Sequence, residues 1–408
     1  MVLTTSRFFP FAIGTALLAA SAAEGQAIDE TAPVLDQVED FAPIGVRSGG
    51  FILYPSIALG LEYTSNLFAA PAGEVEDVRA TIAPGLIAER EGDALRIRGT
   101  ASAAINRYVD RTSENSVAAL LQLDAAYRFS ETDRLRYEGH WRRRVEDRGD
   151  PEARTLLGLG PRLIDIVSGE FEYERTGTRL GFGLLAGASR FDHRSAIDAE
   201  RDYDEIRLSG RLSYRLGGRT NIFVRPFYTQ RDFRLATDDS GVNRDAITYG
   251  ARAGVEFDAE GRLRGSLGIG AFRFDPEDGA LDERTGLSVQ GSLIYQPVER
   301  TAFLFDAFRG DVATFRAGVT SRVDTRISFG IQQEVRHNLR FQSSLFYRRT
   351  NFIDGGDEET VGGLAELEYR LNRAMAVAFT GQYSDRGSSN PDDRFDRFRG
   401  GVELRLRY

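Results

Sequence analysis

The C-terminal stretch 395–408 alternates between apolar and charged side chains, and this alternation is the strongest constraint on the fold. One face carries Phe398, Val402, Leu404, Leu406 and Tyr408, and the other carries Arg399, Glu403, Arg405 and Arg407. A period of two is the side-chain period of a β-strand, so one face suits an apolar environment and the other suits water. A soluble edge strand has the same pattern. The fold therefore depends on whether the pattern recurs along the chain.

The alternation recurs in at least six further segments, which are 95–106, 134–142, 206–216, 326–332, 339–348 and 361–371. Each places apolar or small residues on one face and arginine with other polar residues on the opposite face. Arginine at alternate positions in strand after strand argues against the dry core of a sandwich and against the inner strands of a propeller. It indicates a wide, water-filled lumen.

The composition agrees with a barrel that crosses a membrane by strands. Mean hydropathy is -0.32, and no apolar run after the N-terminus is long enough for a transmembrane helix. Barrels escape such a test because only alternate residues face lipid. The 27 Phe, 15 Tyr and 43 Gly against 12 Pro suit many strands with aromatic girdles. The net charge of -9 argues against a nucleic-acid partner, and the absence of cysteine excludes disulfides and thiolate metal sites.

The connections between the expected strands are alternately short and long. Short turns are expected at 91–93, 130–132, 176–177, 217–218, 259–261, 297–299, 336–338 and 372–373, and long acidic segments near 64–76, 109–115, 146–161, 193–202, 235–244, 275–284, 311–320, 353–360 and 385–395. Short periplasmic turns and longer extracellular loops are the layout of outer-membrane barrels. We therefore predict an all-β fold, a transmembrane antiparallel up-and-down β-barrel of about 18 strands (16–18), over residues 50–408.

The N-terminus has the features of a secretory signal. Arg7 precedes an apolar stretch, Phe8 to Ala20, and small residues at Ala20 to Ala23 offer cleavage sites. We predict a signal peptide over residues 1–23 that is cleaved during export. Residues 24–49 are acidic and aperiodic, and we expect a short, mobile periplasmic lead-in. The predicted location is the outer membrane.

Two stretches resemble known outer-membrane proteins. The opening strand ends in Tyr63-Thr64-Ser65-Asn66-Leu67-Phe68, a Tyr-x-x-Asn-x-Phe turn, and it resembles the putative β-barrel porin 2 family of Gram-negative bacteria. The final strand, ending on Tyr408, resembles the C-terminal assembly signal of such barrels. The resemblance implies a porin for polysaccharide export or secretion without catalytic residues. It also implies outer-membrane lipid or lipopolysaccharide, the barrel-assembly machinery, and polysaccharide or export-complex proteins as partners.

The arginine rows are the candidate functional site. The predicted lumen-lining residues are Arg134, Arg136, Glu138, His140, Arg142, Arg207, Arg211, Arg215, Arg340, Arg348, Arg399, Glu403, Arg405 and Arg407. They form either a structural lattice of ion pairs or a selectivity surface for anions or anionic sugars. The corresponding functions are a porin-like channel with anion preference and, as the alternative, a structural or adhesive barrel with a closed lumen and partner-binding loops.

Other chemistry has weaker support in the sequence. The only histidines, His140, His193 and His337, are too dispersed for a metal site or a catalytic triad, so we expect no enzyme, no metal and no cofactor. Gly181, Gly183 and Gly187 miss the nucleotide-binding pattern and are expected to let the sheet bend or to leave room for a neighbouring aromatic residue. Acidic clusters at 238–239, 275–278, 357–359 and 392–393 could hold calcium, but solvated loops are the simpler interpretation.

Overall fold

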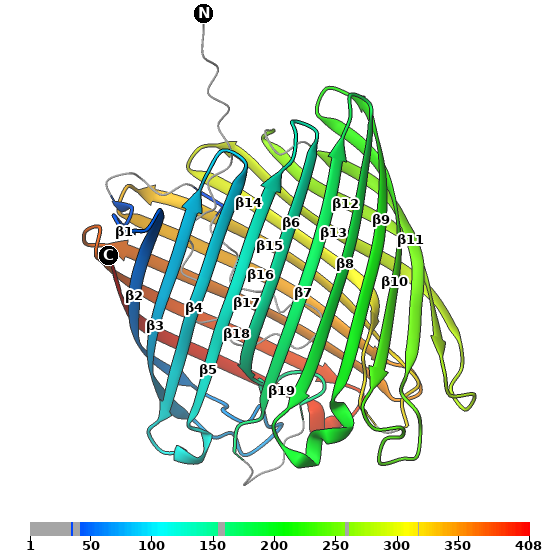
Figure 1. Ribbon diagram of the computed structural model, residues 1–408. Helices are drawn as coiled ribbons and strands as arrows, with labels where there is room; N and C mark the ends of the chain where they lie inside the picture. Colours follow the sequence, from blue (N-terminus) through cyan, green and yellow to red (C-terminus); the bar gives the residue numbers. More distant parts are fainter. Residues whose placement is uncertain (1–33, 36–40, 154–159, 258–260, 317) are drawn as a thin grey trace, which may run out of the picture.

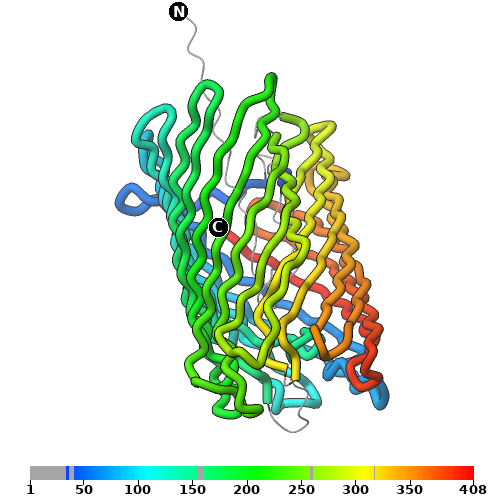
Figure 2. The backbone as a smooth tube through the Cα atoms, turned by 90° about the vertical axis from the view of Figure 1, so that its right-hand side faces the viewer, coloured from blue at the N-terminus to red at the C-terminus, as the bar shows by residue number. Residues whose placement is uncertain are grey.

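The computed structural model describes residues 34–35, 41–153, 160–257, 261–316 and 318–408, and its strands β2 to β19 form one closed antiparallel barrel of 18 strands (Figure 1). Each strand pairs with the next in sequence, and β19 pairs with β2 to close the barrel (Figure 2). This confirms the predicted fold class. The strands are β2 (Phe51–Thr64), β3 (Asp77–Glu91), β4 (Leu95–Tyr108), β5 (Ser116–Arg128), β6 (Asp133–Val145), β7 (Leu163–Thr176), β8 (Leu180–His193), β9 (Tyr203–Gly217), β10 (Thr220–Phe233), β11 (Ala246–Phe257), β12 (Leu263–Pro276), β13 (Arg284–Val298), β14 (Thr301–Val312), β15 (Arg322–Arg336), β16 (Leu339–Phe352), β17 (Gly356–Arg370), β18 (Met375–Ser388) and β19 (Phe395–Arg407).

A short strand, β1 (Val46–Ser48), precedes the barrel and pairs with the beginning of β2. Gly49 and Gly50 make the turn between them, with φ of 56° and 85°. Glycine adopts these left-handed conformations without steric cost, which explains the tight return into β2. The predicted signal peptide over residues 1–23 lies outside the described residues.

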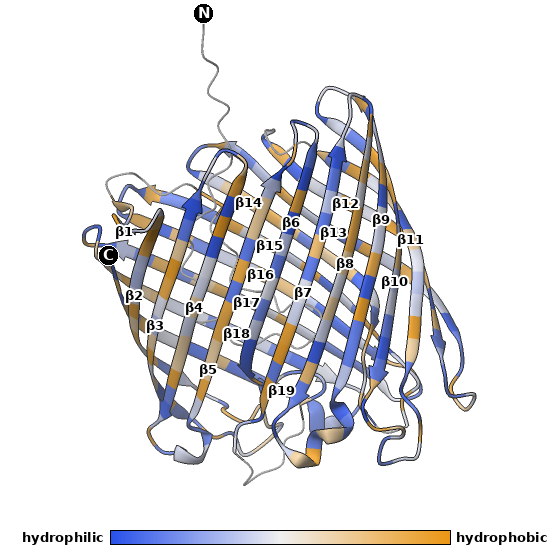
Figure 3. Ribbon diagram, in the orientation of Figure 1, coloured by the Kyte–Doolittle hydropathy of each residue, from blue (hydrophilic) through white to orange (hydrophobic). Residues whose placement is uncertain are grey.

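Hydrophilic and hydrophobic residues alternate along the strands, as the period-two pattern predicts (Figure 3). Large apolar side chains point outward and are exposed, among them Leu61 (54%) and Leu345 (65%). Arginines and carboxylates occupy the alternate, inward positions. A closed barrel pairs its backbone N–H and C=O groups between strands, so its outer surface can be apolar enough for lipid. None of the helices in the described part of the chain is long and apolar enough to cross a membrane.

The connections place short turns at one end of the barrel and longer loops at the other, and we call these the short-turn end and the loop end. The C-terminus and β1 lie at the short-turn end (Figure 1). Three 3-10 helices in the described residues lie at the loop end, and they are η2 (Thr112–Glu114), η3 (Ala196–Arg201) and η4 (Pro391–Asp393). The predicted turn at 259–261 lies largely outside the described residues.

One predicted long loop is wrong. The β16–β17 connection covers only residues 353–355, and the acidic residues Asp357, Glu358 and Glu359 belong to β17. Asp357 pairs in register with Asn351 of β16, and Arg349 forms ion pairs with Asp357 (2.9 Å) and Glu359 (3.4 Å). Consecutive acidic residues lack the apolar alternation that marks a strand, so the sequence pattern ends before the strand does.

Two hairpins bend into the lumen at the loop end. Strand β14 pairs with β13 only as far as Arg309, whereas it pairs with β15 as far as Val312. Strand β6 likewise pairs with β5 only as far as Arg143, whereas it pairs with β7 as far as Val145. The ends of β14 and β6 therefore separate from the neighbouring strands β13 and β5. Val145 packs on a row of buried alanines, Ala58, Ala83, Ala104 and Ala118, that lines the lumen face of β2 to β5.

Candidate functional site

The connections at the tips of the two bent hairpins meet inside the lumen. We call them the lumen cap: residues 146–153 and 160–162 between β6 and β7, and residues 313–316 and 318–321 between β14 and β15. Asp147 accepts a hydrogen bond from Arg397 of β19 (2.8 Å) and bonds Arg399 of the same strand. The carbonyl of Gly149 accepts from Arg386 of β18. The β6–β7 connection therefore crosses the lumen to a distant part of the wall.

The two parts of the lumen cap also bind each other. Arg322, at the start of β15, donates to Glu152 (3.2 Å), and the backbone N–H of Phe315 donates to the same carboxylate (3.4 Å). Arg316 donates to the carbonyl of Pro151 (3.0 Å) and to Glu358 of β17 (2.9 Å). These contacts fix the cap to both the β15 and β17 walls and narrow the loop end.

Helix η3 supports the cap from a third side. Arg201 forms an ion pair with Glu146, and each side chain is 2% exposed. The guanidinium of Arg201 also lies 5.0 Å from the ring centre of Phe315, which joins an aromatic cluster with Tyr203 and Phe233. Burial raises the pKa of Glu146, but the charge of Arg201 outweighs it and lowers that pKa below its ordinary value. The carboxylate therefore stays ionised at neutral pH.

Two residues of the N-terminal segment lie inside the lumen near the short-turn end. Leu35 is 1% exposed and packs on Ala302 and Leu304 of β14, with Ile294 of β13 beside them. The N–H of Val34 donates to Gln332 of β15 (2.7 Å), and Arg340 of β16 donates to the Leu35 carbonyl (3.3 Å). The sequence predicts a mobile periplasmic lead-in, whereas these two of its residues are held inside the lumen. These apolar lumen side chains give it a place to dock that the alternation pattern did not indicate.

All of the predicted lumen-lining residues lie on the inner face, and part of them form a dense lattice at the short-turn end. Arg405 contacts Glu366 (2.8 Å), Glu368 (2.8 Å) and Glu403 (2.5 Å), and Arg370 also contacts Glu368 (2.7 Å). Each of these side chains is less than a tenth exposed. An arginine held by three carboxylates has few donors left for a solute, so this part of the predicted set is structural.

Arg340 donates to the Leu35 carbonyl, and the remaining predicted arginines divide into two groups. In the first group, Arg136 pairs with Glu172, Arg207 with Glu170 and Glu205, Arg211 with Glu256, Arg348 with Asp324, and Arg399 with Asp147. The second group has no carboxylate of the described chain within 4 Å, and it consists of Arg134, Arg142, Arg215 and Arg407. The predicted Glu138 and His140 face Asp124 and Gln122 of β5 across the inner wall. Arg407 is buried, with its Nε and Nη2 covered, which leaves Arg134, Arg142 and Arg215 available to ions in the lumen.

The three histidines occupy separate parts of the barrel. His193 contacts Asp202 (3.1 Å) below the lumen cap, His140 faces the lumen from β6, and His337 lies in a short turn. Within the described residues no group of three His, Cys, Asp or Glu side chains could hold a metal ion.

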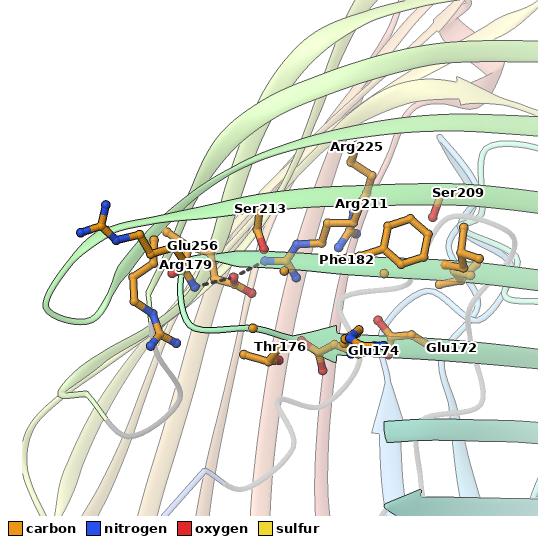
Figure 4. A pocket seen from close by; sticks show the side chains of 18 residues that line it. Glu172, Glu174, Thr176, Arg179, Phe182, Ser209, Arg211, Ser213, Arg225 and Glu256 are labelled. Atoms are coloured by element: carbon orange, nitrogen blue, oxygen red, sulfur yellow. Dashed lines mark hydrogen bonds and ion pairs between the residues drawn. The ribbon is translucent and has the colours of Figure 1, made fainter. Parts of the chain in front are cut away.

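The glycines of β8 make room for polar side chains. A Cβ atom at Gly181 would lie 2.4 Å from the Ser213 hydroxyl, and one at Gly183 would lie 3.4 Å from Cβ of Arg211. Because these glycines have no side chains, a recess of about 60 Å³ remains in the lumen wall, and Arg225 and Glu256 also line it (Figure 4). The sequence predicts an aromatic neighbour as one reason for these glycines, whereas the nearest side chains to Gly181 and Gly183 are the polar Ser213 and Arg211.

Sequence reasoning missed the cap contacts and several lumen arginines, notably Arg225 of β10 and Arg252 of β11. The inner face of β10 also carries Phe223 and Phe227, so apolar residues occur on both faces and the period-two contrast is weak. A search for arginine and phenylalanine at alternate positions would have found Arg225. No local signal marks Asp147, because its partners lie on β19.

Comparisons with known proteins give the family. The sequence matches the family described as "putative beta-barrel porin 2" over residues 39–408. No curated protein matches the sequence.

Similar solved structures include the siderophore receptor PirA from Pseudomonas aeruginosa (10% identity, TM-score 0.43, covering 87% of this chain and 80% of that one) and the outer membrane protein OpdK from the same organism (14%, 0.45, 87% and 99%). A third is the FrpB iron transporter from Neisseria meningitidis (12%, 0.46, 86% and 65%). At these identities they are similar in general architecture only. The family match spans the barrel from β1 to the final strand, and the chain belongs to the putative beta-barrel porin 2 family.

Proposed function

We propose that the barrel is an outer-membrane conduit that prefers anionic solutes and serves the export of polysaccharide. The observation that carries this proposal is the set of lumen arginines, among them Arg134, Arg142 and Arg215, that have no carboxylate partner within the part of the chain that the structure describes. A guanidinium stays charged at every accessible pH, and a narrow passage with low-dielectric walls focuses its field. The family resemblance supports polysaccharide export as the setting. A cleaved signal peptide and insertion by the assembly machinery belong to the same proposal.

Conductance of the purified protein in a planar bilayer tests the conduit. We expect discrete current steps, and in a salt gradient a reversal potential on the anion side. Changing Arg134, Arg142 and Arg215 together to Glu should move the reversal potential toward cations. The matched control changes three outward arginines, Arg143, Arg190 and Arg349, to Glu, which should leave the reversal potential unchanged. An equal shift in both triple variants would contradict selectivity by the lumen wall.

A second candidate is a structural or adhesive barrel with a closed lumen. The lumen cap favours it, because Glu152 joins Arg322 and Asp147 joins β19 across the passage. In this case the loop end would bind partner molecules and the arginines would only support the wall. Absence of current steps from a correctly folded, heat-modifiable barrel would favour this candidate over the conduit.

We further propose that the protein has no enzymatic activity and requires no cofactor. Support comes from the distribution of the histidines: His140 lies in the lumen wall, His193 below the cap and His337 in a turn at the opposite end. A hydrolytic triad needs its base beside a nucleophile, and a metal site needs several ligands together.

A further inference from the structure

Arg225 and Arg252 occupy directly opposite positions on neighbouring strands. They pair in register between β10 and β11, and both face the lumen. Side chains in such positions have Cβ atoms about 5 Å apart, and like charges there destabilise a sheet. Figure 4 shows Arg211 of β9 beside Arg225, but Arg211 is ion-paired with Glu256. A wall that only needed stability would place an acid next to Arg225 and Arg252 as well.

No carboxylate within the described residues lies within 4 Å of either Arg225 or Arg252. The acids that act on Arg225 at longer range are Glu170, Glu172 and Glu256. Each of these three acids forms an ion pair with a different arginine: Glu170 pairs with Arg207 (3.8 Å), Glu172 with Arg136 (3.6 Å), and Glu256 with Arg211. The two positive charges at Arg225 and Arg252 are therefore not compensated by the wall.

Aromatic rings support both guanidiniums. Arg252 lies 4.3 Å from the ring centre of Phe227, and Arg225 lies 5.8 Å from that of Phe223. Such stacking covers the flat face of a guanidinium and leaves the N–H groups at its edge for an acceptor. Within the described chain, the Nε of Arg225 has no hydrogen-bond partner, and Arg252 donates only to the hydroxyl of Ser288, at 3.5 Å.

A glycine on β12, Gly268, leaves room for the ring of Phe223. A Cβ atom at Gly268 would lie 3.1 Å from Cζ of Phe223 and 3.5 Å from Cβ of Arg252. The recess of about 60 Å³ on the other side of Arg225 gives a bound group space beside the wall. The arrangement is open toward the lumen and held by rigid strands, which favours binding because little ordering is needed.

We propose that Arg225 and Arg252 form a binding site for one oxyanion group, a carboxylate, sulfate or phosphate, on the lumen wall. Two adjacent guanidiniums offer several N–H donors to the two or three oxygens of such a group, whereas chloride is a single atom and cannot match parallel donors with separate acceptors. The site adds to the proposed function the chemical class of solute that the conduit would bind. Its role in transport rests on the proposed function, whereas oxyanion binding itself does not.

Equilibrium binding tests the site without requiring an open pore. Sodium sulfate is titrated into the barrel in detergent micelles at constant ionic strength, set with sodium chloride, and the heat of binding is measured. We expect saturable sulfate binding, weakened about tenfold or more in R225Q and in R252Q. R143Q, which removes the same charge from an ion-paired position on the outer face, should bind like the wild type. R225K, which keeps the charge and loses the fork, should fall between wild type and R225Q.

The outcomes separate this site from the proposed function. Heat-modifiable migration on a gel first establishes that each variant is a folded barrel. Absence of saturable sulfate binding to the wild type, or equal loss in R143Q and R225Q, overturns the site. Acetate and phosphate arms determine which oxyanion is preferred. A barrel that binds sulfate but conducts no current would retain the site and refute the conduit.

Discussion

Asp147 is the residue on which the lumen cap most depends. Its carboxylate holds Arg397 and Arg399, and the three side chains are largely buried. Removing one partner of a buried ion pair costs about 3–5 kcal/mol, because the remaining charge is left without compensation. We expect D147N to loosen the cap and to give larger and more frequent current steps in a bilayer. D239N, which changes an exposed acid of the same end, should conduct like the wild type, and equal behaviour of the two variants would contradict this role.

The same carboxylate sets the pH dependence of the cap. Burial raises the pKa of Asp147, but Arg397 and Arg399 outweigh it and lower that pKa well below the ordinary value of about 3.9. A pKa that is lower in the folded state contributes stability above the unfolded pKa, and this is lost as the pH falls through the folded pKa. Asp150 has the opposite sign, because burial raises its pKa. We expect equal currents at pH 7 and pH 5 and a looser cap only below about pH 4; loosening near pH 6 would refute this assignment.

The N-terminal segment is an element whose docking can be tested separately. Burying a leucine contributes about 2 kcal/mol, and Leu35 is fully covered by lumen side chains. A carboxylate there would be desolvated, so L35D should release the segment from the lumen and raise the single-channel conductance. The matched control is I44D, since Ile44 is 65% exposed. An unchanged conductance in L35D would show that the docked segment does not narrow the passage.

The hairpin connections determine the orientation of the barrel. We expect the loop end to face outward and the short-turn end to face the periplasm. An epitope tag in the 389–394 connection should be stained on intact cells, and one at Gly218 only after permeabilisation. Asp357 is unsuitable for a tag because it pairs with Asn351 within the sheet. Staining of both tags on intact cells would reject the orientation.

Closure of the whole molecule depends on the last strand. β19 pairs with β2 from Arg399 opposite Thr64 to Arg407 opposite Ser56, and the N–H of Tyr408 donates to the Pro55 carbonyl (3.1 Å). We expect deletion of Tyr408 to abolish assembly and the heat-modifiable band in membrane fractions. Y408F keeps the terminal ring and should assemble normally. Normal assembly of the deletion variant would show that the terminal aromatic residue is not the signal.

The sequence alone determined the barrel, its strand number and the facing of its side chains. In β19, β9 and β6 the apolar face contacts lipid and the polar face contacts water. These two environments require apolar and polar residues to alternate along the strand, and the sequence shows this period of two directly. Strand ends were less certain. Around Asp357 to Glu359 both faces are polar, and backbone pairing with β16 continues the strand beyond the visible pattern.

Only the tertiary structure decided what lies inside the lumen. Asp147 meets Arg399 across 252 positions of sequence, and Leu35 meets Leu304 of β14. These contacts depend on closure of the barrel and on the inward bending of two hairpins, neither of which a local pattern encodes. Among the described residues, the lack of a carboxylate partner at Arg225 and Arg252 is likewise a property of the assembled wall, because neighbouring arginines pair with the surrounding acids. Periodicity records the environment of each face, whereas pairing across the lumen depends on distances that only the folded chain fixes.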